Sequence, residues 1–132
     1  MSPRVTGIGG VFFKARDPKA LQEWYRVHLG FDISEWGGAV FHWQTPESPN
    51  PDGATAWSLF PETTKHFAPS TASFMINYRV DDLDGLLASL RAAGCAVDEK
   101  THADDFGKFG WVMDPEGNRI ELWEPPAKAP GA

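Results

Sequence analysis

Apolar residues recur along the chain with two periods, one typical of helices and one typical of strands. Two sets have helical spacing: Leu21, Trp24, Tyr25 and His28, followed later by Leu83, Leu86, Leu87 and Leu90. Asp17 and Pro18 precede the first set and Gly30 follows it, while Asp81 or Asp82 precedes the second set and Gly94 follows it. Asp at an N-cap, Pro in the first turn and Gly after the last turn are the residues that start and stop helices. The pattern therefore predicts two helices.

Short runs of apolar and aromatic residues surround each predicted helix. They are residues 5–15, 31–36, 39–43 and 55–60 in the first half, and residues 71–80, 95–99, 106–114 and 119–124 in the second half. The offset from Asp17 to Asp82 is 65 residues, and the offset from Gly30 to Gly94 is 64 residues. Such a regular offset indicates one βαβββ unit used twice. Residues 44–54 and 61–70 are polar and contain Pro, so both are predicted loops, and the second is a linker between the units.

The last predicted strand carries a charged residue, Glu121, between two apolar ones. Because side chains alternate along a strand, Ile120 and Leu122 should face the helix, and Glu121 should face the opposite side. The same alternation, applied to the other strands, gives the predicted ligand-binding residues: Phe12, Ser58, Phe60, Met75, Asn77, Arg79, Arg119 and Trp123. This mixture of aromatic, amide, thioether and cationic side chains is typical of a partly buried cleft.

The composition narrows the class of protein. A chain of 132 residues is expected to form one domain that buries about two-thirds of its unfolded surface. The net charge of −6 and the lack of a basic run argue against a nucleic-acid partner. No apolar segment approaches the roughly 20 residues needed to span a membrane, and no secretory signal is recognisable. With Cys95 as its single cysteine, the chain is predicted to be soluble and cytoplasmic.

The tandem βαβββ units, the HLGF sequence at 28–31 and the closing DPEGNRIELWEP at 114–125 resemble the vicinal oxygen chelate superfamily. That superfamily includes glyoxalase I, extradiol dioxygenases and the fosfomycin and bleomycin resistance proteins. The resemblance implies an α+β fold in which two modules form a cup-shaped, incompletely closed β-barrel with the helices outside. It places module one at about 5–60 and module two at about 71–125 of a single domain spanning 1–132, with 126–132 as a flexible tail. It also implies a small-molecule ligand and a homodimer.

The resemblance further implies a divalent metal ion held by four strand positions, which in this chain are Gly10, Ser58, Met75 and Glu121. Glu121 matches the carboxylate of the family. Gly10 and Met75 stand where the family has His, and Ser58 stands where it has Glu or His. A catalytic zinc site typically takes at least three oxygen or nitrogen donors from the protein. We therefore predict a degenerate metal site with no bound metal.

Other residues could supply a relocated metal site. His42, His66 and His102 lie in a predicted strand or in loops, and Asp104 and Asp105 follow His102 closely. A loop histidine is more often simply solvated, so this reading is a minor alternative. Cys95 begins a predicted strand and is expected to be a small buried residue.

Three interpretations of Glu121 remain open at the level of sequence. It could form an ion pair with Arg79 or Arg119. It could be a desolvated carboxylate with a raised pKa that acts as a general base. With a cation close by, it could instead be an ionised part of a polar clamp for a ligand.

We predict a glyoxalase- or bleomycin-resistance-like protein that binds a small organic molecule in an aromatic cup, with Glu121 as its candidate catalytic residue. No cofactor is predicted. The alternative is a lyase, isomerase or dioxygenase of the same superfamily that uses a divalent metal ion. No nucleophile elbow, phosphate-binding loop or dinucleotide-binding motif competes with these hypotheses.

Overall fold

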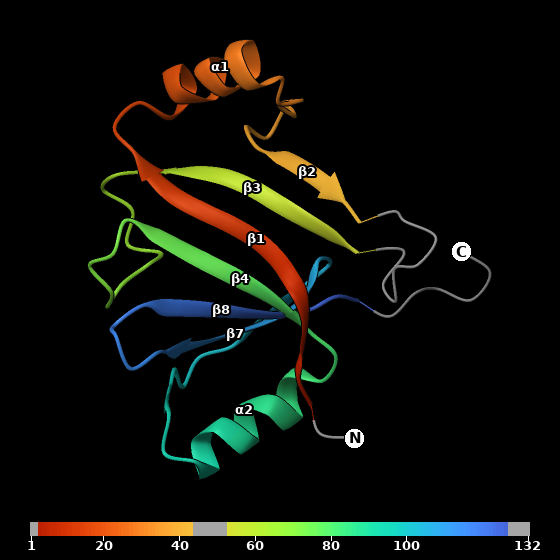
Figure 1. Cartoon of the computed structure of the whole chain (residues 1–132). Helices are drawn as coiled ribbons and strands as arrows, with labels where there is room; N and C mark the ends of the chain where they lie inside the picture. The colour runs from red at the N-terminus through yellow and green to blue at the C-terminus, as the bar shows by residue number, and fades with distance from the viewer. Residues whose placement is uncertain (1–2, 44–52, 127–132) are drawn as a thin grey trace, which may run out of the picture.

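The computed structural model describes residues 3–43 and 53–126, which form two helices and one curved mixed sheet (Figure 1). The elements in chain order are β1 (Val5–Ala15), α1 (Pro18–Leu29), β2 (Ala39–His42), β3 (Ala54–Pro61), β4 (Phe74–Val80), α2 (Leu83–Ala92), β5 (Ala96–Val97), β6 (His102–Asp104), β7 (Gly107–Met113) and β8 (Arg119–Glu124). The predicted α+β fold, an unclosed curved sheet built from two related halves, is confirmed.

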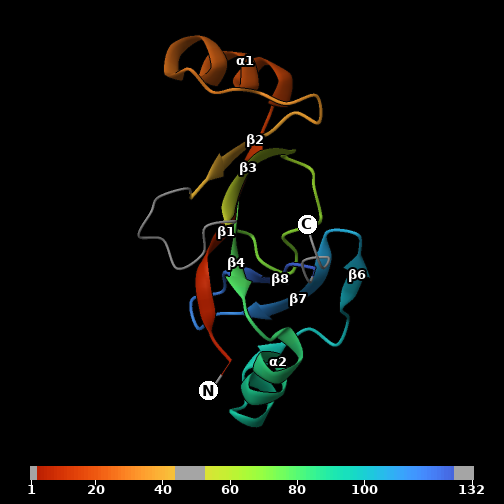
Figure 2. The ribbon, with the colours of Figure 1, turned by 90° about the vertical axis from the view of Figure 1, so that its right-hand side faces the viewer.

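The sheet joins the two halves through their first strands. In the described part of the chain its order is β2-β3-β1-β4-β8-β7-β5, and β6 pairs with β7. The pair β1–β4 is antiparallel, whereas β1–β3 within the first half and β4–β8 within the second half are parallel. The first and last strands of each half are therefore neighbours, and all four lie together in the middle of the molecule. Seen at right angles to Figure 1, β7 and β6 curve away from β1 and β3, which gives the sheet a hollow side (Figure 2).

Both helices begin and end where the sequence predicts. The Asp17 carboxylate accepts a hydrogen bond from the backbone N–H of Ala20 at 3.1 Å, and Asp82 caps α2 in the same way. After α1 the chain turns at Gly30, whose φ of 72° lies in the left-handed region that only glycine adopts easily. The N–H of Gly30 donates to the carbonyl of Tyr25, which closes the last turn.

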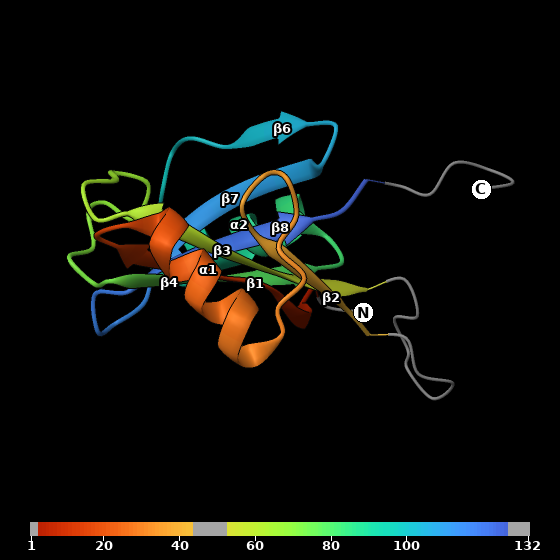
Figure 3. The ribbon, with the colours of Figure 1, turned by 90° about the horizontal axis from the view of Figure 1, so that it is seen from above.

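Each helix covers its own end of the sheet with a separate core. The core under α2 contains Val80, Leu83, Leu87, Val112 and Leu122. The core under α1 contains Ala15, Ala39, Trp57 and Leu59, with Tyr25 and Phe31 packed against them. In the view from above, α1 lies in front of the sheet and β6 lies beyond β7 (Figure 3). The strand faces predicted to be apolar therefore point to the helices, and the opposite face of the central strands remains for a site.

Two predicted elements differ in the structure. Residues 31–36 are not a strand, because Phe31 packs edge-on against Trp57 at 4.8 Å and a turn from Ser34 to Gly38 follows. The alternating apolar residues there fill the core under α1 instead of pairing with a neighbouring strand. Residues 102–104, predicted as a loop, form strand β6 on the edge of β7.

The segment 61–70, predicted as a polar linker, packs onto the sheet. Its Phe67 is 0% exposed and contacts the ring of Phe60, with centroids 5.2 Å apart. This contact brings the neighbouring His66 over strand β8. Of the other predicted loops and tails, residues 44–52 and 127–132 lie outside the described residues. In the described part of the chain, neither helix has the length and apolar character required to cross a bilayer.

Candidate functional site

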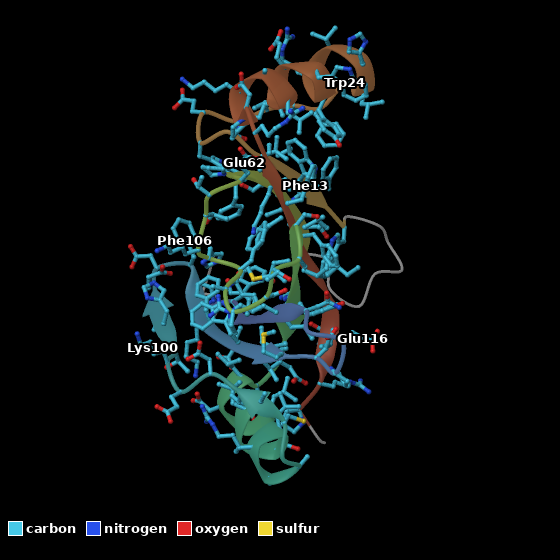
Figure 4. The ribbon with its side chains drawn as sticks, turned by 90° about the vertical axis from the view of Figure 1, so that its left-hand side faces the viewer. Phe13, Trp24, Glu62, Lys100, Phe106 and Glu116 are labelled. Atoms are coloured by element: carbon cyan, nitrogen blue, oxygen red, sulfur yellow. The ribbon has the colours of Figure 1, made fainter. Side chains whose placement is uncertain are left out.

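A cavity of about 610 Å³ lies on the hollow side of the sheet, between the segment 61–70 and strands β6 and β7. We call it the Glu121 cavity, and its lining residues are Phe12, Phe60, Lys65, His66, Ala68, Asp98, Lys100, Thr101, His102, Asp104, Phe109, Trp111, Arg119 and Glu121. Figure 4 shows Lys100, Phe106 and Glu62 on this same side, while Trp24 lies at the far end on α1. Every strand in the centre of the molecule except β4 contributes a residue to its wall.

Glu121 lies at the wall of this cavity and is only 5% exposed. Three side chains donate hydrogen bonds to its carboxylate: Asn77 Nδ2 to Oε1 at 2.7 Å, Trp111 Nε1 to Oε2 at 2.9 Å, and His66 Nε2 to Oε2 at 3.1 Å. Strand register explains two of these contacts, because Asn77 on β4 and Trp111 on β7 are the residues directly beside Glu121 in the sheet. The third donor comes from the segment 61–70.

The pKa of Glu121 results from two opposing effects. Burial raises the pKa, because a carboxylate loses its hydration inside the protein. The hydrogen bonds from His66, Asn77 and Trp111 favour the ionised form and together outweigh burial, so the pKa lies below its ordinary value. Glu121 is therefore an ionised acceptor surrounded by donors, and the lowered pKa speaks against one of its three interpretations, the desolvated carboxyl group with a raised pKa.

The interpretation of Glu121 as the ion-pair partner of Arg79 or Arg119 does not agree with the contacts of these two residues. Arg119 donates to the carbonyl of His66 and pairs with Asp98 at 3.3 Å. Arg79 lies over the ring of Trp43, 5.8 Å from its centroid. Within the described residues, the basic side chain next to the Glu121 carboxylate is His66, whose Nε2 lies 3.1 Å from Oε2.

The structure brings only some of the predicted binding residues together. Phe12, Phe60, Arg119 and Glu121 line the cavity. Asn77 is 3% exposed and lies behind Glu121, so it holds the carboxylate and does not face the cavity. The remaining four, Ser58, Met75, Arg79 and Trp123, are not lining residues.

Each of these four residues has a different surrounding. Met75 is fully buried, and Ser58 is the strand neighbour of Phe12. The indole N–H of Trp123 donates to the carbonyl of Phe106 at 2.7 Å. Trp123 lies near the C-terminal end of β8. Alternation assigned these residues to the correct strand face, but it could not tell which positions along each strand reach the cavity.

Sequence reasoning missed Trp111 and the cavity-facing role of His66. Trp111 could have been found, because alternation along β7 places it on the face opposite Gly110 and Val112, where Phe109 also lies. His66 had no comparable signal, since a residue in a predicted loop has no assigned face. Cys95, expected to be buried, is exposed.

The residues at the four family positions do not fit a divalent metal ion. A Cβ on Gly10 would lie 2.7 Å from Cζ of Phe12, so the ring of Phe12 occupies the space where a ligand side chain at this position would extend. Met75 is a buried thioether and Ser58 offers one hydroxyl, both weak ligands for hard cations. His66 and Glu121 are two donors that already bond to each other.

Within residues 3–43 and 53–126, no alternative cluster supplies the missing donors. The described residues contain no group of three or more His, Cys, Asp or Glu side chains arranged to hold a metal ion. His102 bonds to Asp104 at 2.8 Å as an isolated pair on β6, and Asp104 also accepts from the backbone N–H of Phe106. The chemistry available at the cavity is therefore that of an ordered histidine and carboxylate beside aromatic walls.

The curved sheet, the helices outside it and a site on the adjoining first and last strands of each half define a vicinal oxygen chelate fold. The model of the glyoxalase-like domain family matches residues 10–123 of this chain, and the chain therefore belongs to that family. Comparison with curated proteins gives no match.

Several solved structures share the fold at low sequence identity. Methylmalonyl-CoA epimerase from Mycobacterium tuberculosis is 22% identical with a TM-score of 0.64, covering 97% of this chain and 93% of that chain. A variant of the Streptomyces coelicolor epimerase in complex with 2-nitronate-propionyl-CoA is 20% identical with a TM-score of 0.68, covering 94% and 100%. A glyoxalase/bleomycin resistance protein/dioxygenase superfamily member from Vibrio splendidus 12B01 is 14% identical with a TM-score of 0.57, covering 93% and 99%. At these identities the likeness establishes the fold alone.

Proposed function

We propose that this protein binds a small, partly apolar organic molecule in the Glu121 cavity and does so without a divalent metal ion. The observation that carries the proposal is the state of Glu121, whose carboxylate accepts three hydrogen bonds from protein side chains. A carboxylate that accepts three hydrogen bonds from the protein has a structural role in the wall of the cavity, which supports binding without a metal ion. The volume of about 610 Å³ is within the range of small-molecule sites, and Phe12, Phe60, Phe109 and Trp111 supply apolar contact area.

Metal analysis and ligand-induced stabilisation test this proposal together. Protein purified without chelators should contain no stoichiometric metal, and nickel, zinc, manganese or iron(II) should not raise its melting temperature. A small aromatic ligand at 100 times its Kd should stabilise the protein by about 2.7 kcal/mol. For a domain of this size that corresponds to a rise in melting temperature of roughly 10 °C.

The alternative is a metal-dependent lyase, isomerase or dioxygenase of the same superfamily. It is supported by membership of the glyoxalase-like family, and by the epimerases of the same fold that are in complex with acyl-CoA compounds. Stoichiometric metal, or stabilisation by metal that disappears in Glu121→Ala, would favour this alternative and contradict our proposal. A protein with a purely structural role would show no stabilisation by any compound of the series.

We also propose that the protein is a cytoplasmic homodimer. Exposed apolar side chains gather on and after α1, namely Trp24, Val27, Leu29 and Trp36. Burying such a group against a second copy would be favourable. Sedimentation equilibrium of the wild-type protein and of Trp24→Ser measures this, with a concentration-dependent dimer expected only in the wild type.

A further inference from the structure

His66 is held in one orientation although it belongs to a connecting segment. Its ring stacks on Phe60 with an interplanar angle of 4° and a centroid distance of 5.4 Å. The ring also meets Trp111 edge-on at 6.4 Å, and the backbone carbonyl of His66 accepts a hydrogen bond from Arg119. The imidazole is therefore held by Phe60, Trp111 and Glu121, yet its side chain remains 36% exposed and lines the cavity.

The contact with Glu121 determines which nitrogen of His66 carries the proton. An ionised carboxylate only accepts hydrogen bonds, so Nε2 must be the donor in the pair. A neutral imidazole carries one N–H, and Nδ1 is then left with a lone pair. Within residues 3–43 and 53–126, the structure gives Nδ1 of His66 no hydrogen-bond donor. Because His66 lines the cavity, we take Nδ1 as the acceptor of this side chain that remains for a ligand.

The three carboxylates that line the cavity each have a partner within the protein. Asp98 pairs with Arg119, Asp104 pairs with His102, and Glu121 pairs with His66. Two lining cations, Lys65 and Lys100, have no ion-pair partner in the described part of the chain. Lys65 and Lys100 are thus the lining charges that a ligand can pair with, even though the net charge of the chain is −6.

We propose that the Glu121 cavity recognises an aromatic hydroxy acid. Its hydroxyl donates a hydrogen bond to Nδ1 of His66, its ring packs among the aromatic walls, and its anionic group is attracted by Lys65 and Lys100. Glu121 is the positioning residue of this arrangement, because it fixes the tautomer that leaves Nδ1 with a lone pair. The proposal rests on the proposed function and adds the chemical class of the ligand.

The tautomer can be measured without any ligand. Nitrogen-15 NMR of the wild-type protein at about pH 8, where an ordinary imidazole is neutral, should show the His66 proton on Nε2. In Glu121→Gln the amide can donate as well as accept, so a mixture of tautomers is expected. A His66 proton on Nδ1 in the wild type would overturn the inference.

Matched probes test the recognition itself. Binding of 4-hydroxybenzoate, 4-methoxybenzoate and phenol is compared by titration calorimetry. The methoxy compound lacks the donor and phenol lacks the anionic group, and each should bind about tenfold more weakly than 4-hydroxybenzoate, as the loss of one polar contact predicts. In His66→Phe, which keeps the stacking area, the preference for hydroxyl over methoxy should disappear. In His28→Phe, whose residue lies on α1 beside Trp24, the preference should remain.

The outcomes separate the two proposals. Equal binding of all three probes would sink this inference and leave the proposed function standing. Binding of none of them, together with stoichiometric metal in the purified protein, would contradict the proposed function as well. A preference for hydroxyl that persists in His66→Phe would assign the recognition to another residue.

Discussion

Replacing Glu121 by alanine tests whether its carboxylate stabilises the centre of the molecule. The substitution removes the acceptor of three hydrogen bonds at once. Asn77, at 3% exposed, then loses its partner in a place that water reaches poorly. Removing one member of a buried, hydrogen-bonded charge network costs about 3–5 kcal/mol. The melting temperature should therefore fall by roughly 10–20 °C.

Glutamine at the same position separates the loss of charge from the loss of all partners. Its side chain has nearly the same volume but only one acceptor oxygen. In the described part of the chain, Oδ1 of Asn77 is buried and has no hydrogen-bond partner, so after a turn of its amide Asn77 could accept a hydrogen bond from the new glutamine. Three charge-assisted hydrogen bonds become ordinary ones, and we expect a cost of about 1–2 kcal/mol.

Urea unfolding followed by tryptophan fluorescence measures both variants. Glu116→Ala is the matched control, because Glu116 is exposed in the turn before β8 and its substitution should change stability by less than about 0.5 kcal/mol. A Glu121→Ala protein within about 1 kcal/mol of the wild type would refute the reasoning. So would a Glu121→Gln protein as unstable as Glu121→Ala.

Three further predictions concern single features of the structure. Gly10→Ala should destabilise the protein by about 1–3 kcal/mol, because the new Cβ would lie 2.7 Å from the ring of Phe12; a neutral or stabilising effect in urea would contradict this. Asp82→Ala should cost about 0.5–2 kcal/mol by removing the N-cap of α2, and amide exchange of the first turn of α2 should accelerate; unchanged exchange would argue against the cap. The pKa of Glu121 lies below its ordinary value of 4.5, so its contribution to stability is complete above that pH and disappears as the pH falls through the lower folded value. The stability difference between the wild type and Glu121→Gln should therefore shrink on acidification below about pH 4.5, and a difference that grows there would show the opposite sign.

Local signals in the sequence were sufficient for much of the fold. Asp17, Asp82 and Gly30 set the limits of the helices, because capping depends on a few adjacent residues. The repeat offset gave the two related halves, and strand alternation gave the face on which Glu121 lies. The strand predicted at 31–36 was wrong, because alternation is also compatible with packing against a core residue. Phe31 packs against Trp57 and has no need of a neighbouring strand.

The candidate site could be predicted only in part. Alternation assigns a face of the sheet to each strand residue, whereas it assigns no face to a loop residue such as His66. Phe12, Phe60, Arg119 and Glu121 were expected from alternation and line the cavity. Phe67 has a polar neighbourhood in the sequence, so its complete burial, which positions His66, could not be anticipated.

The sequence by itself determined the family fold and the carboxylate at position 121, and it predicted Gly10, Ser58 and Met75 at the other three positions where the resemblance implies metal ligands. Only the tertiary structure decided which donors surround that carboxylate and in which direction its pKa shifts. Its pKa depends on donors from β4, β7 and the segment 61–70, which are as far as 55 residues away in sequence. Hydrogen bonding acts over about 3 Å in space whatever the separation along the chain. Periodicity can therefore assign Glu121 to a face, whereas its partners are fixed only when the sheet and the segment above it are packed together.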